Sequence, residues 1–276
     1  MRHLITIINS ILLLQLNSDD RISCLKYYSA NKYDYKTMFK EDTTAFSLQT
    51  REMFASIAPR YDFLNCLLSL GQDKNWRKRA IDLLDPVKND RILDVATGTC
   101  DMIIEIAKRK LSTHIFGIDF CQNMLTLGKT KVSQKNFNNK ISFQVGSGEC
   151  LPFANNFFDS IICSFGVRNF ANIQMGLEEF YRVLKPGGKI VILEFSEPQN
   201  KILNIIYVFY FHFILPKIGN LVSGHSNAYS YLPESVANFP NQKEFIEWIR
   251  KIGFKKASFI ELTFGIVSIH RAFKNI

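Results

Sequence analysis

Short, nearly continuous apolar runs recur along the chain from position 91, with amphipathic stretches between most of them. The runs are rich in β-branched and aromatic residues, as expected for strands buried on both faces. They are RILDVAT (91–97), HIFGIDF (114–120), ISFQVG (141–146), FDSIICSFG (158–166) and GKIVILEFS (188–196). The stretches at 101–110, 122–132 and 172–184 are helical in pattern. Alternating strands and helices of this length predict a parallel, doubly wound α/β sheet.

The end of the chain breaks this alternation. ASFIELTF (257–264) and IVSIHRAFK (266–274) are strand-like runs separated by Gly265, which predicts an antiparallel hairpin. Before them, the segment KPGG (185–188) is expected to end the helix at 184, since proline cannot continue a helix and glycine favours its end. We therefore predict a mostly parallel sheet that finishes in an antiparallel hairpin.

The N-terminal region has a different pattern. An apolar run at 4–16 follows Arg2 and is too short to span a bilayer comfortably. It is compatible with a secretory signal and with the apolar face of an organelle-targeting helix. The stretch up to position 47 lacks clear periodicity, so we expect a targeting leader or disordered extension at 1–47 and the folded domain at 48–276.

Composition excludes several classes of protein. With 47% hydrophobic and 21% charged residues, the chain is neither disordered throughout nor a membrane-spanning bundle. The net charge of +9 is compatible with nucleic acid, anionic lipid or a mitochondrial address, but the chain has no dense Lys/Arg run, so we expect no nucleic-acid binding. The six cysteines form no CxxC pair and the five histidines no HExxH motif, so we expect no metal site.

A turn with candidate chemistry follows the first predicted strand. The segment DVATGTCD (94–101) is made mostly of small residues, which let a backbone pass close to a bulky ligand. A dinucleotide pyrophosphate would require GxGxxG, and only Gly98 is a glycine here. The turn is therefore interpreted either as a nucleoside-binding loop or as a plain tight turn.

Asp119 ends the second predicted strand. In doubly wound folds an acid at this place accepts hydrogen bonds from the two ribose hydroxyls of a nucleoside. The alternative is an ordinary helix N-cap. The turn and the acid together favour nucleoside recognition at the carboxyl ends of the strands.

At this point the sequence resembles a known family. From about Arg51 to Lys274 it is similar to the ubiquinone/menaquinone biosynthesis C-methyltransferases, and in particular to the mitochondrial 2-methoxy-6-polyprenyl-1,4-benzoquinol methylase type. The similarity rests on blocks in the same order. They are MFASIAPRYDFLNCLLSLGQDKNWRK (53–78), ECLPFANNFFDSIICSFGVRNF (149–170), YRVLKPGGKIVILEFSEP (181–198), FHFILPKIGNLVSG (211–224), YSYLPESVANFP (229–240) and GIVSIHRAFK (265–274).

The resemblance implies a class I S-adenosylmethionine-dependent methyltransferase fold, a Rossmann-like sheet, with the methyltransferase domain at 48–276. It implies bound S-adenosyl-L-methionine, with cofactor contacts from the turn, the ribose acid, the adenine side and the end of the fourth strand. These contacts are Gly98, Thr99, Asp119, Ser147, Gly148 and Ser164. Two departures weaken parts of this set: the family's turn is usually richer in glycine than one carrying Thr97 and Cys100, and Ser147 stands where an acid or amide is common.

Methylation of a ring carbon needs a ring made electron-rich by loss of a hydroxyl proton, and in-line approach to the methyl group. Arg168, after the fourth strand, is predicted to stabilise the phenolate or polarise a water that takes the proton, because a guanidinium stays protonated. Asn169 is predicted to orient the ring oxygen. The alternative for the pair is a surface salt bridge and a turn-forming asparagine.

Substrate contacts are expected from Tyr61, which would cover the cofactor, and from Tyr229 and Tyr231 in the quinol pocket. The region 201–222 is rich in large apolar residues, and we interpret it as a mixture of a buried helix and a lid that covers a greasy tail and touches a membrane.

The predicted function is therefore C-methylation of 2-methoxy-6-polyprenyl-1,4-benzoquinol in ubiquinone biosynthesis. Alternatives are a demethylmenaquinone C-methyltransferase and a non-catalytic scaffold of a quinone-synthesis complex. The expected partners are the polyprenyl quinol, a membrane surface bound peripherally, a ubiquinone-synthesis complex and a second copy in a homodimer. The expected location is the mitochondrion, on the matrix side of the inner membrane, with another organelle reached through the leader as the alternative.

Overall fold

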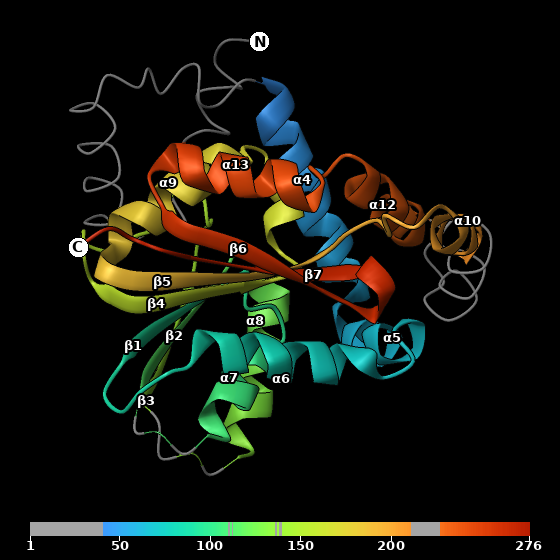
Figure 1. Cartoon of the computed structure of the whole chain (residues 1–276). Coiled ribbons are helices and arrows are strands. Elements are labelled where there is room, and N and C mark those ends of the chain that lie inside the picture. The colour runs from blue at the N-terminus through green and yellow to red at the C-terminus, as the bar shows by residue number, and fades with distance from the viewer. Residues whose placement is uncertain (1–40, 110, 112, 136, 138–139, 211–226) are drawn as a thin grey trace.

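The structure is a computed structural model, and it describes residues 41–276 except 110, 112, 136, 138–139 and 211–226. Within this part of the chain, seven strands form one sheet in the order β3-β2-β1-β4-β5-β7-β6 (Figure 1). The strands are β1 (Arg91–Val95), β2 (His114–Asp119), β3 (Lys140–Val145), β4 (Phe158–Ser164), β5 (Leu184–Phe195), β6 (Lys255–Leu262) and β7 (Val267–Phe273). Each predicted strand is present, with ends that differ by a few residues.

Strands β1 to β5 are mutually parallel, and β7 runs antiparallel between β5 and β6. The mostly parallel sheet with a terminal antiparallel hairpin is thus confirmed. The KPGG segment behaves differently from the prediction, since it ends the helix at Val183 but lies inside β5. The reason is that the chain's C-terminus pairs with it: Gly187 N–H donates to Lys274 O at 3.1 Å, and Lys274 N–H donates to Gly188 O at 2.8 Å.

Helices cover both faces of the sheet (Figure 1). One face carries α6 (Gln72–Leu84), α7 (Asp101–Ala107) and α8 (Gln122–Ser133), and the other carries α9 (Ile173–Val183) and α13 (Gln242–Ile252). Alternation along β1 explains the two layers: Leu93 and Val95 pack under α9 and α13, whereas Ile92 packs against α6 and α7. The two helical layers pack against the sheet and so fix the positions of the strand ends.

A cap of further helices lies at the carboxyl edge of the parallel strands. It consists of α4 (Glu41–Ile57), the 3₁₀ turn η1 (Ala58–Arg60), α5 (Tyr61–Leu68), α10 (Lys201–Phe209) and α12 (Asn227–Ala237). Their apolar side chains form one cluster with Phe195 and Ile266, at the ends of the sheet. Helix α4 begins before the predicted domain boundary at 47/48, and the nature of the segment before it stays a prediction.

Of the predicted lid at 201–222, α10 is described and positions 211–222 lie outside the described residues. In the part of the chain that the structure covers, no helix is both long and apolar enough to cross a bilayer.

Candidate active site

The turn after β1 is built from left-handed backbone. Ala96, Gly98 and Cys100 have φ of 54°, 53° and 67°. An ideal Cβ on Gly98 would meet nothing within 4 Å, so the space beside the turn is open, as a bound ligand requires. Left-handed backbone strains residues other than glycine, and such strain collects at functional sites. The turn is therefore a shaped cradle rather than an ordinary tight turn.

Cys100, the departure from a glycine-rich turn, fits because of a neighbouring helix. Its side chain is fully buried against α8, where a Cβ on Gly128 would lie 2.2 Å from the Cys100 Sγ. The glycine on α8 thus makes the room that the cysteine in the turn occupies.

Asp119 is tied to the turn directly. Its carboxylate accepts the Gly98 N–H at 2.7 Å and the Cys121 N–H at 2.8 Å, so it ties the turn to the residue that precedes α8. A carboxylate has about four lone-pair sites, which leaves capacity for ribose hydroxyls. Burial raises the pKa of Asp119 to about 6. The N-cap residue of α8 is Cys121, so Asp119 is not the helix cap, and its position fits the interpretation as a nucleoside-binding acid.

Polar atoms are left over at the same edge. Among the described residues, Asp94 Oδ1 and Ser164 Oγ are buried without a hydrogen-bond partner. Asp94 accepts a hydrogen bond from the Thr97 hydroxyl on its other oxygen, and burial raises its pKa to about 7. Buried polar groups are normally satisfied, so unpaired atoms beside an open turn fit a polar ligand.

Ser147 and Gly148 lie between β3 and β4. Ser147 Oγ donates to Glu149 Oε2 at 3.3 Å, and an added Cβ on Gly148 would lie 2.4 Å from the Phe170 ring. Glu149 is a residue that sequence reasoning missed, and its carboxylate lies next to the Ser147 hydroxyl. Burial raises its pKa. The glycine is required for the close approach of Phe170.

A network of charges joins the cap to the turn. Thr99 Oγ1 donates to Asp62 of α5, and Lys131 Nζ lies 2.6 Å from both Asp62 Oδ2 and Asp101 Oδ1. Arg77 pairs with Asp73 and approaches Asp101 Oδ2 at 3.5 Å. Sequence reasoning missed these residues, although Asp62 and Arg77 stand inside the quoted block 53–78. The network fixes α5 over the turn that carries Thr99.

Beside the turn, the cap encloses an apolar cavity of about 390 Å³. Its walls come from α4, α5, α6, α10, α12 and the turn between β6 and β7. Representative apolar lining residues are Phe54, Leu64, Trp76, Phe195, Leu203 and Tyr207. The polar groups that reach it include Arg168, Tyr61 and Tyr231, so this is a greasy pocket with few polar contacts.

Arg168 and Asn169 lie in the 3₁₀ turn η2 (Val167–Asn169) after β4, and Arg168 lines this cavity. Arg168 NH1 lies 2.6 Å from Glu194 Oε1 and donates to Phe165 O at 2.7 Å. Its side chain is 6% exposed, so the pair is buried rather than a surface salt bridge. Burial alone would lower the pKa of Arg168, but the negative charge of Glu194 has the larger effect. The pKa of Arg168 is therefore raised above its ordinary value.

Asn169 is hydrogen-bonded to Tyr231, another of the predicted residues. The Tyr231 hydroxyl donates to Asn169 Oδ1 at 3.0 Å, and Asn169 Nδ2 donates to Phe165 O at 3.3 Å. Glu194, which holds Arg168, was also missed from the sequence, where it reads only as part of a strand.

The structure therefore brings most predicted residues to one edge. Tyr61 lines the cavity next to Asp62, and burial raises its pKa. Tyr231 lines the same cavity, and Tyr229 lies on α12 with its side chain outside the described part. No group of three metal-binding side chains occurs within the described ranges.

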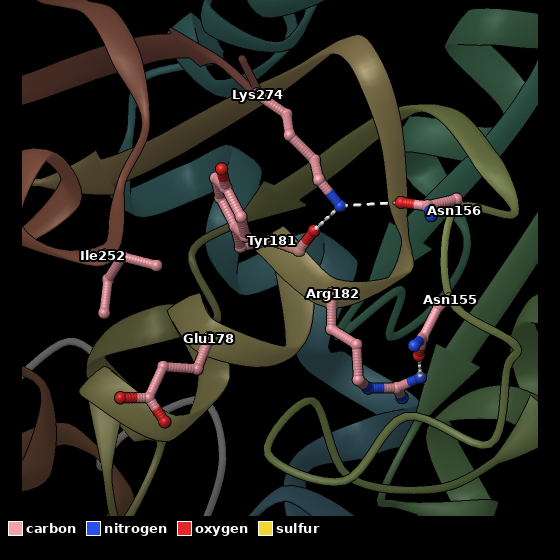
Figure 2. A pocket seen from close by; sticks show the side chains of 7 residues that line it. All are labelled: Asn155, Asn156, Glu178, Tyr181, Arg182, Ile252 and Lys274. Carbon is pink, nitrogen blue, oxygen red and sulfur yellow. Dashed lines mark hydrogen bonds between the residues drawn. The ribbon is translucent and has the colours of Figure 1, made fainter. Parts of the chain in front are cut away.

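A second hollow of about 240 Å³ lies at the opposite, amino edge of the sheet. Figure 2 shows Lys274 and Arg182 reaching into it with Asn155 and Asn156. Lys274 Nζ donates to Asn156 Oδ1 at 2.7 Å and to the carbonyls of Tyr181 and Leu184 at 2.8 Å, and Arg182 is engaged by Glu179 and loop carbonyls. These cations are satisfied by the fold itself.

The sheet order, the turn after β1 and the acid after β2 define the class I S-adenosylmethionine-dependent methyltransferase fold. Solved structures agree: the [4+2]-cyclase SpnF aligns over 83% of this chain and 96% of that one, with a TM-score of 0.63 at 14% identity. A phosphoethanolamine N-methyltransferase 2 of Haemonchus contortus in complex with S-adenosyl-L-methionine covers 72% of this chain and 52% of its own, with a TM-score of 0.54 at 15% identity.

The chain belongs to the ubiE/COQ5 methyltransferase family, whose model matches residues 40–274. The ubiquinone/menaquinone biosynthesis C-methyltransferase UbiE of Geotalea daltonii is 48% identical over 84% of this chain and 98% of its own. A demethylmenaquinone methyltransferase of Deinococcus radiodurans is 45% identical over 79% of this chain and 90% of its own. The protein is thus a C-methyltransferase of quinone biosynthesis that uses S-adenosylmethionine, and these relatives are bacterial rather than specifically of the mitochondrial type.

Proposed function

We propose that this chain methylates a ring carbon of 2-methoxy-6-polyprenyl-1,4-benzoquinol on the route to ubiquinone, as an enzyme of the mitochondrial type. The observation that carries the proposal is the apolar cavity beside the cofactor turn, with Arg168 and the Tyr231–Asn169 pair at its wall. A quinol with an isoprenoid tail needs such a site: apolar walls for the tail and ring, and a few polar groups for the ring oxygens.

The cofactor would lie along the carboxyl edge from Thr99 to Ser164. Gly98 leaves the open space, Asp119 holds the ribose, Ser147 with Glu149 and Gly148 flank the adenine, and Ser164 offers its unpaired hydroxyl. S-adenosylmethionine supplies, when bound, a methyl group on a positively charged sulfur that is open to attack by carbon. The chain's own contribution is to hold that group next to the cavity.

Arg168 stabilises the charge that develops on the ring oxygen. It cannot accept the proton, because Glu194 and the chemistry of guanidinium keep it protonated. The hydroxyl proton would therefore pass to a water polarised by Arg168. As the ring carbon took up the methyl group, the methyl–sulfur bond would break and leave the neutral thioether, and the ring carbon would then lose its hydrogen as a proton to water. Asn169, fixed by Tyr231 and Phe165 O, orients the ring oxygen. Tyr61, between Asp62 and the cavity, covers the cofactor.

The second candidate is demethylmenaquinone C-methylation. The relatives of Deinococcus radiodurans and Bacteroides fragilis that carry this name favour it, at 45% and 40% identity. The apolar N-terminal run favours the ubiquinone route, since it suggests an organelle. Assaying the purified protein with both quinols tests the proposal: turnover of the benzoquinol is expected, and turnover of the naphthoquinol alone would overturn it.

We further propose that the protein acts as a homodimer in a quinone-synthesis complex, bound peripherally on the matrix side of the mitochondrial inner membrane. Support comes from the leader pattern and from the water-insoluble tail of the substrate. Import of the full chain into isolated mitochondria, followed by carbonate extraction, is expected to release it from the membrane. Failure of import would overturn the location.

A further inference from the structure

Phe165 follows β4 directly and has left-handed backbone, with φ of 56°. A positive φ is uncommon for any residue other than glycine, and it is an outlier for one with a bulky side chain. Glycine would adopt this conformation without strain, and the chain carries one at the adjacent position, Gly166, rather than here. Such strain persists only where the surroundings impose it, and it collects at functional sites. The fold therefore imposes this conformation on Phe165.

The Phe165 ring packs against two aromatic side chains. Its centroid lies 4.6 Å from that of Phe195, at an interplanar angle of 33°, and 6.2 Å from that of Trp76, at 63°. Aromatic pairs at such separations add stabilisation beyond the area that they bury. Trp76 is fixed in turn, because its Nε1 donates to Thr263 Oγ1 at 2.7 Å. The Phe165 N–H donates to Leu193 O at 2.7 Å, so the ring and the backbone of this residue are each held by contacts.

The Phe165 carbonyl is the group that this fixed segment presents to the site. Its oxygen accepts a hydrogen bond from Arg168 NH1 at 2.7 Å and another from Asn169 Nδ2 at 3.3 Å. One backbone atom thus orients both side chains that are predicted to act on the ring oxygen. At Arg168 NH1 the carbonyl acts together with Glu194 Oε1, which lies 2.6 Å away. Two acceptors on one nitrogen fix the guanidinium more narrowly than the ion pair would alone.

The same segment lies directly against the turn after β1. A Cβ on Gly166 would lie 2.5 Å from the Ala96 Cβ and 2.9 Å from the Cys163 Sγ, so the two turns are in close contact. The Phe165 carbonyl is therefore held at a fixed position relative to the turn that is expected to hold the cofactor. A displacement of about 1 Å in a reacting geometry can lower a rate about a hundredfold, so a fixed position matters here.

We propose that Phe165 is a positioning residue for methyl transfer. The packing of its ring imposes the left-handed backbone, and the backbone carbonyl aims Arg168 and Asn169 at the quinol ring oxygen. This inference rests on the proposed function, since it requires a ring oxygen on which Arg168 acts. A phenylalanine that served only the core would contribute to stability and would not change the acidity of a bound phenol.

The test compares Phe165→Leu with the matched control Phe254→Leu in the full chain. Both changes remove a buried ring, and Phe254 packs against Tyr181 in the core under α9 and α13 rather than at the cavity. Leucine has left-handed backbone elsewhere in this chain, at Leu70, so the first variant is compatible with the turn. With a short-tailed quinol we expect kcat per folded molecule to fall about tenfold or more in Phe165→Leu, with cofactor affinity unchanged. Phe254→Leu should keep the wild-type kcat.

A second measurement needs neither turnover nor cofactor. A prenylated nitrophenol, whose anion absorbs visible light, is titrated with pH while bound to each protein. Arg168 stabilises the anion, so the bound phenol should be more acidic in the wild type than in Arg168→Ala. In Phe165→Leu it should be about tenfold less acidic than in the wild type, and in Phe254→Leu it should be unchanged. Trp76→Leu removes the second ring that packs against Phe165, and it should act in the same direction as Phe165→Leu.

Wild-type kcat and wild-type acidity of the bound phenol in Phe165→Leu would overturn the proposal, and so would equal losses in Phe254→Leu. If Phe165→Leu did not fold, unchanged acidity in Trp76→Leu would overturn it instead. The Arg168→Ala variant separates this inference from the proposed function. If it changed neither readout, the proposed role of Arg168 would fail and the inference with it. If it lowered both while Phe165→Leu lowered neither, only the inference would fail.

Discussion

The two edges of the sheet treat buried charge in opposite ways. At the amino edge, Lys274 and Arg182 donate hydrogen bonds to backbone carbonyls, asparagine side chains and Glu179 (Figure 2). The cations beside this hollow are therefore bound by the protein itself. At the carboxyl edge, Asp94 Oδ1 and Ser164 Oγ are among the buried side-chain atoms that have no hydrogen-bond partner in the described part of the chain, and they lie near a turn whose glycine faces open space. Unpaired polar atoms beside open space, rather than the presence of charge, distinguish this edge from the hollow at the amino edge.

The largest expected effect comes from comparing alanine variants of two arginines, Arg168 and Arg182, each of which is paired with a buried carboxylate. Arg168→Ala should lower turnover about a hundredfold or more and leave cofactor affinity unchanged, because it removes charge stabilisation at the ring oxygen. Arg182→Ala should lower stability by roughly 3–5 kcal/mol, since buried Glu179 loses its ion-pair partner and keeps only the hydrogen bond from the Leu151 N–H, with turnover per folded molecule unchanged.

Steady-state rates normalised to folded protein, together with thermal unfolding, measure both effects. Arg168→Ala is expected to be destabilised as well, because it leaves Glu194 unpaired. If Arg168→Ala turned over at nearly the wild-type rate per folded molecule, this residue would have no part in the mechanism. Arg168 would then, like Arg182, serve only stability.

Asp119 gives the next largest effect. Asp119→Ala should weaken S-adenosylmethionine binding by roughly 1–3 kcal/mol, since it removes charge-assisted hydrogen bonds to the ribose and frees the Gly98 N–H. Calorimetric titration measures the affinity. Asp159→Ala, at the amino edge, is the matched control and should bind the cofactor as the wild type does. Unchanged affinity in Asp119→Ala would place the ribose elsewhere.

The same carboxyl predicts opposite pH trends for binding and stability. Its pKa is raised by burial from 3.8 to about 6, so the folded protein favours the protonated form. Its contribution to stability is full below about pH 4 and is lost as the pH rises through about 6, and Asp94, raised to about 7, acts in the same direction. The cofactor needs the carboxylate, so its affinity should rise about tenfold from pH 5 to pH 7.

Titration and thermal unfolding at both pH values test this pair of trends. Asp119→Asn should flatten the change in affinity between pH 5 and pH 7. Affinity and stability that rise together with pH would contradict the assignment.

The sequence alone predicted the layers of the fold and the edge of the sheet that carries the site, but not the side-chain contacts that hold the site residues in place. Nearly continuous apolar runs separated by stretches with helical spacing were enough to predict every strand of the sheet, because burial sets both patterns. Glu194 was missed because a carboxylate inside a buried strand differs from its neighbours only once its partner Arg168 is seen across 26 positions. Glu149, Lys131 and Asp62 were missed for the same reason, because the residues they bind are distant in the sequence and close only in the folded chain. The KPGG segment was predicted only to end the preceding helix, and its place in β5 was missed because its pairing with Lys274 is a tertiary contact.

The smallest expected effect concerns Cys100, which has left-handed backbone at a turn position where glycine would have no conformational strain. Gly128→Ala places a Cβ 2.2 Å from the Cys100 Sγ and should destabilise the protein by roughly 1 kcal/mol or somewhat more, because the packed turn must shift. Cys100→Gly relieves the left-handed strain but empties the same space. The double variant should therefore be more stable than the sum of the two single changes, with a coupling of at least about 0.5 kcal/mol, as contacting residues show. Denaturant unfolding of the four proteins measures the coupling. Strict additivity would mean that the cysteine and the glycine do not share this space, and that the turn holds its left-handed backbone by another contact.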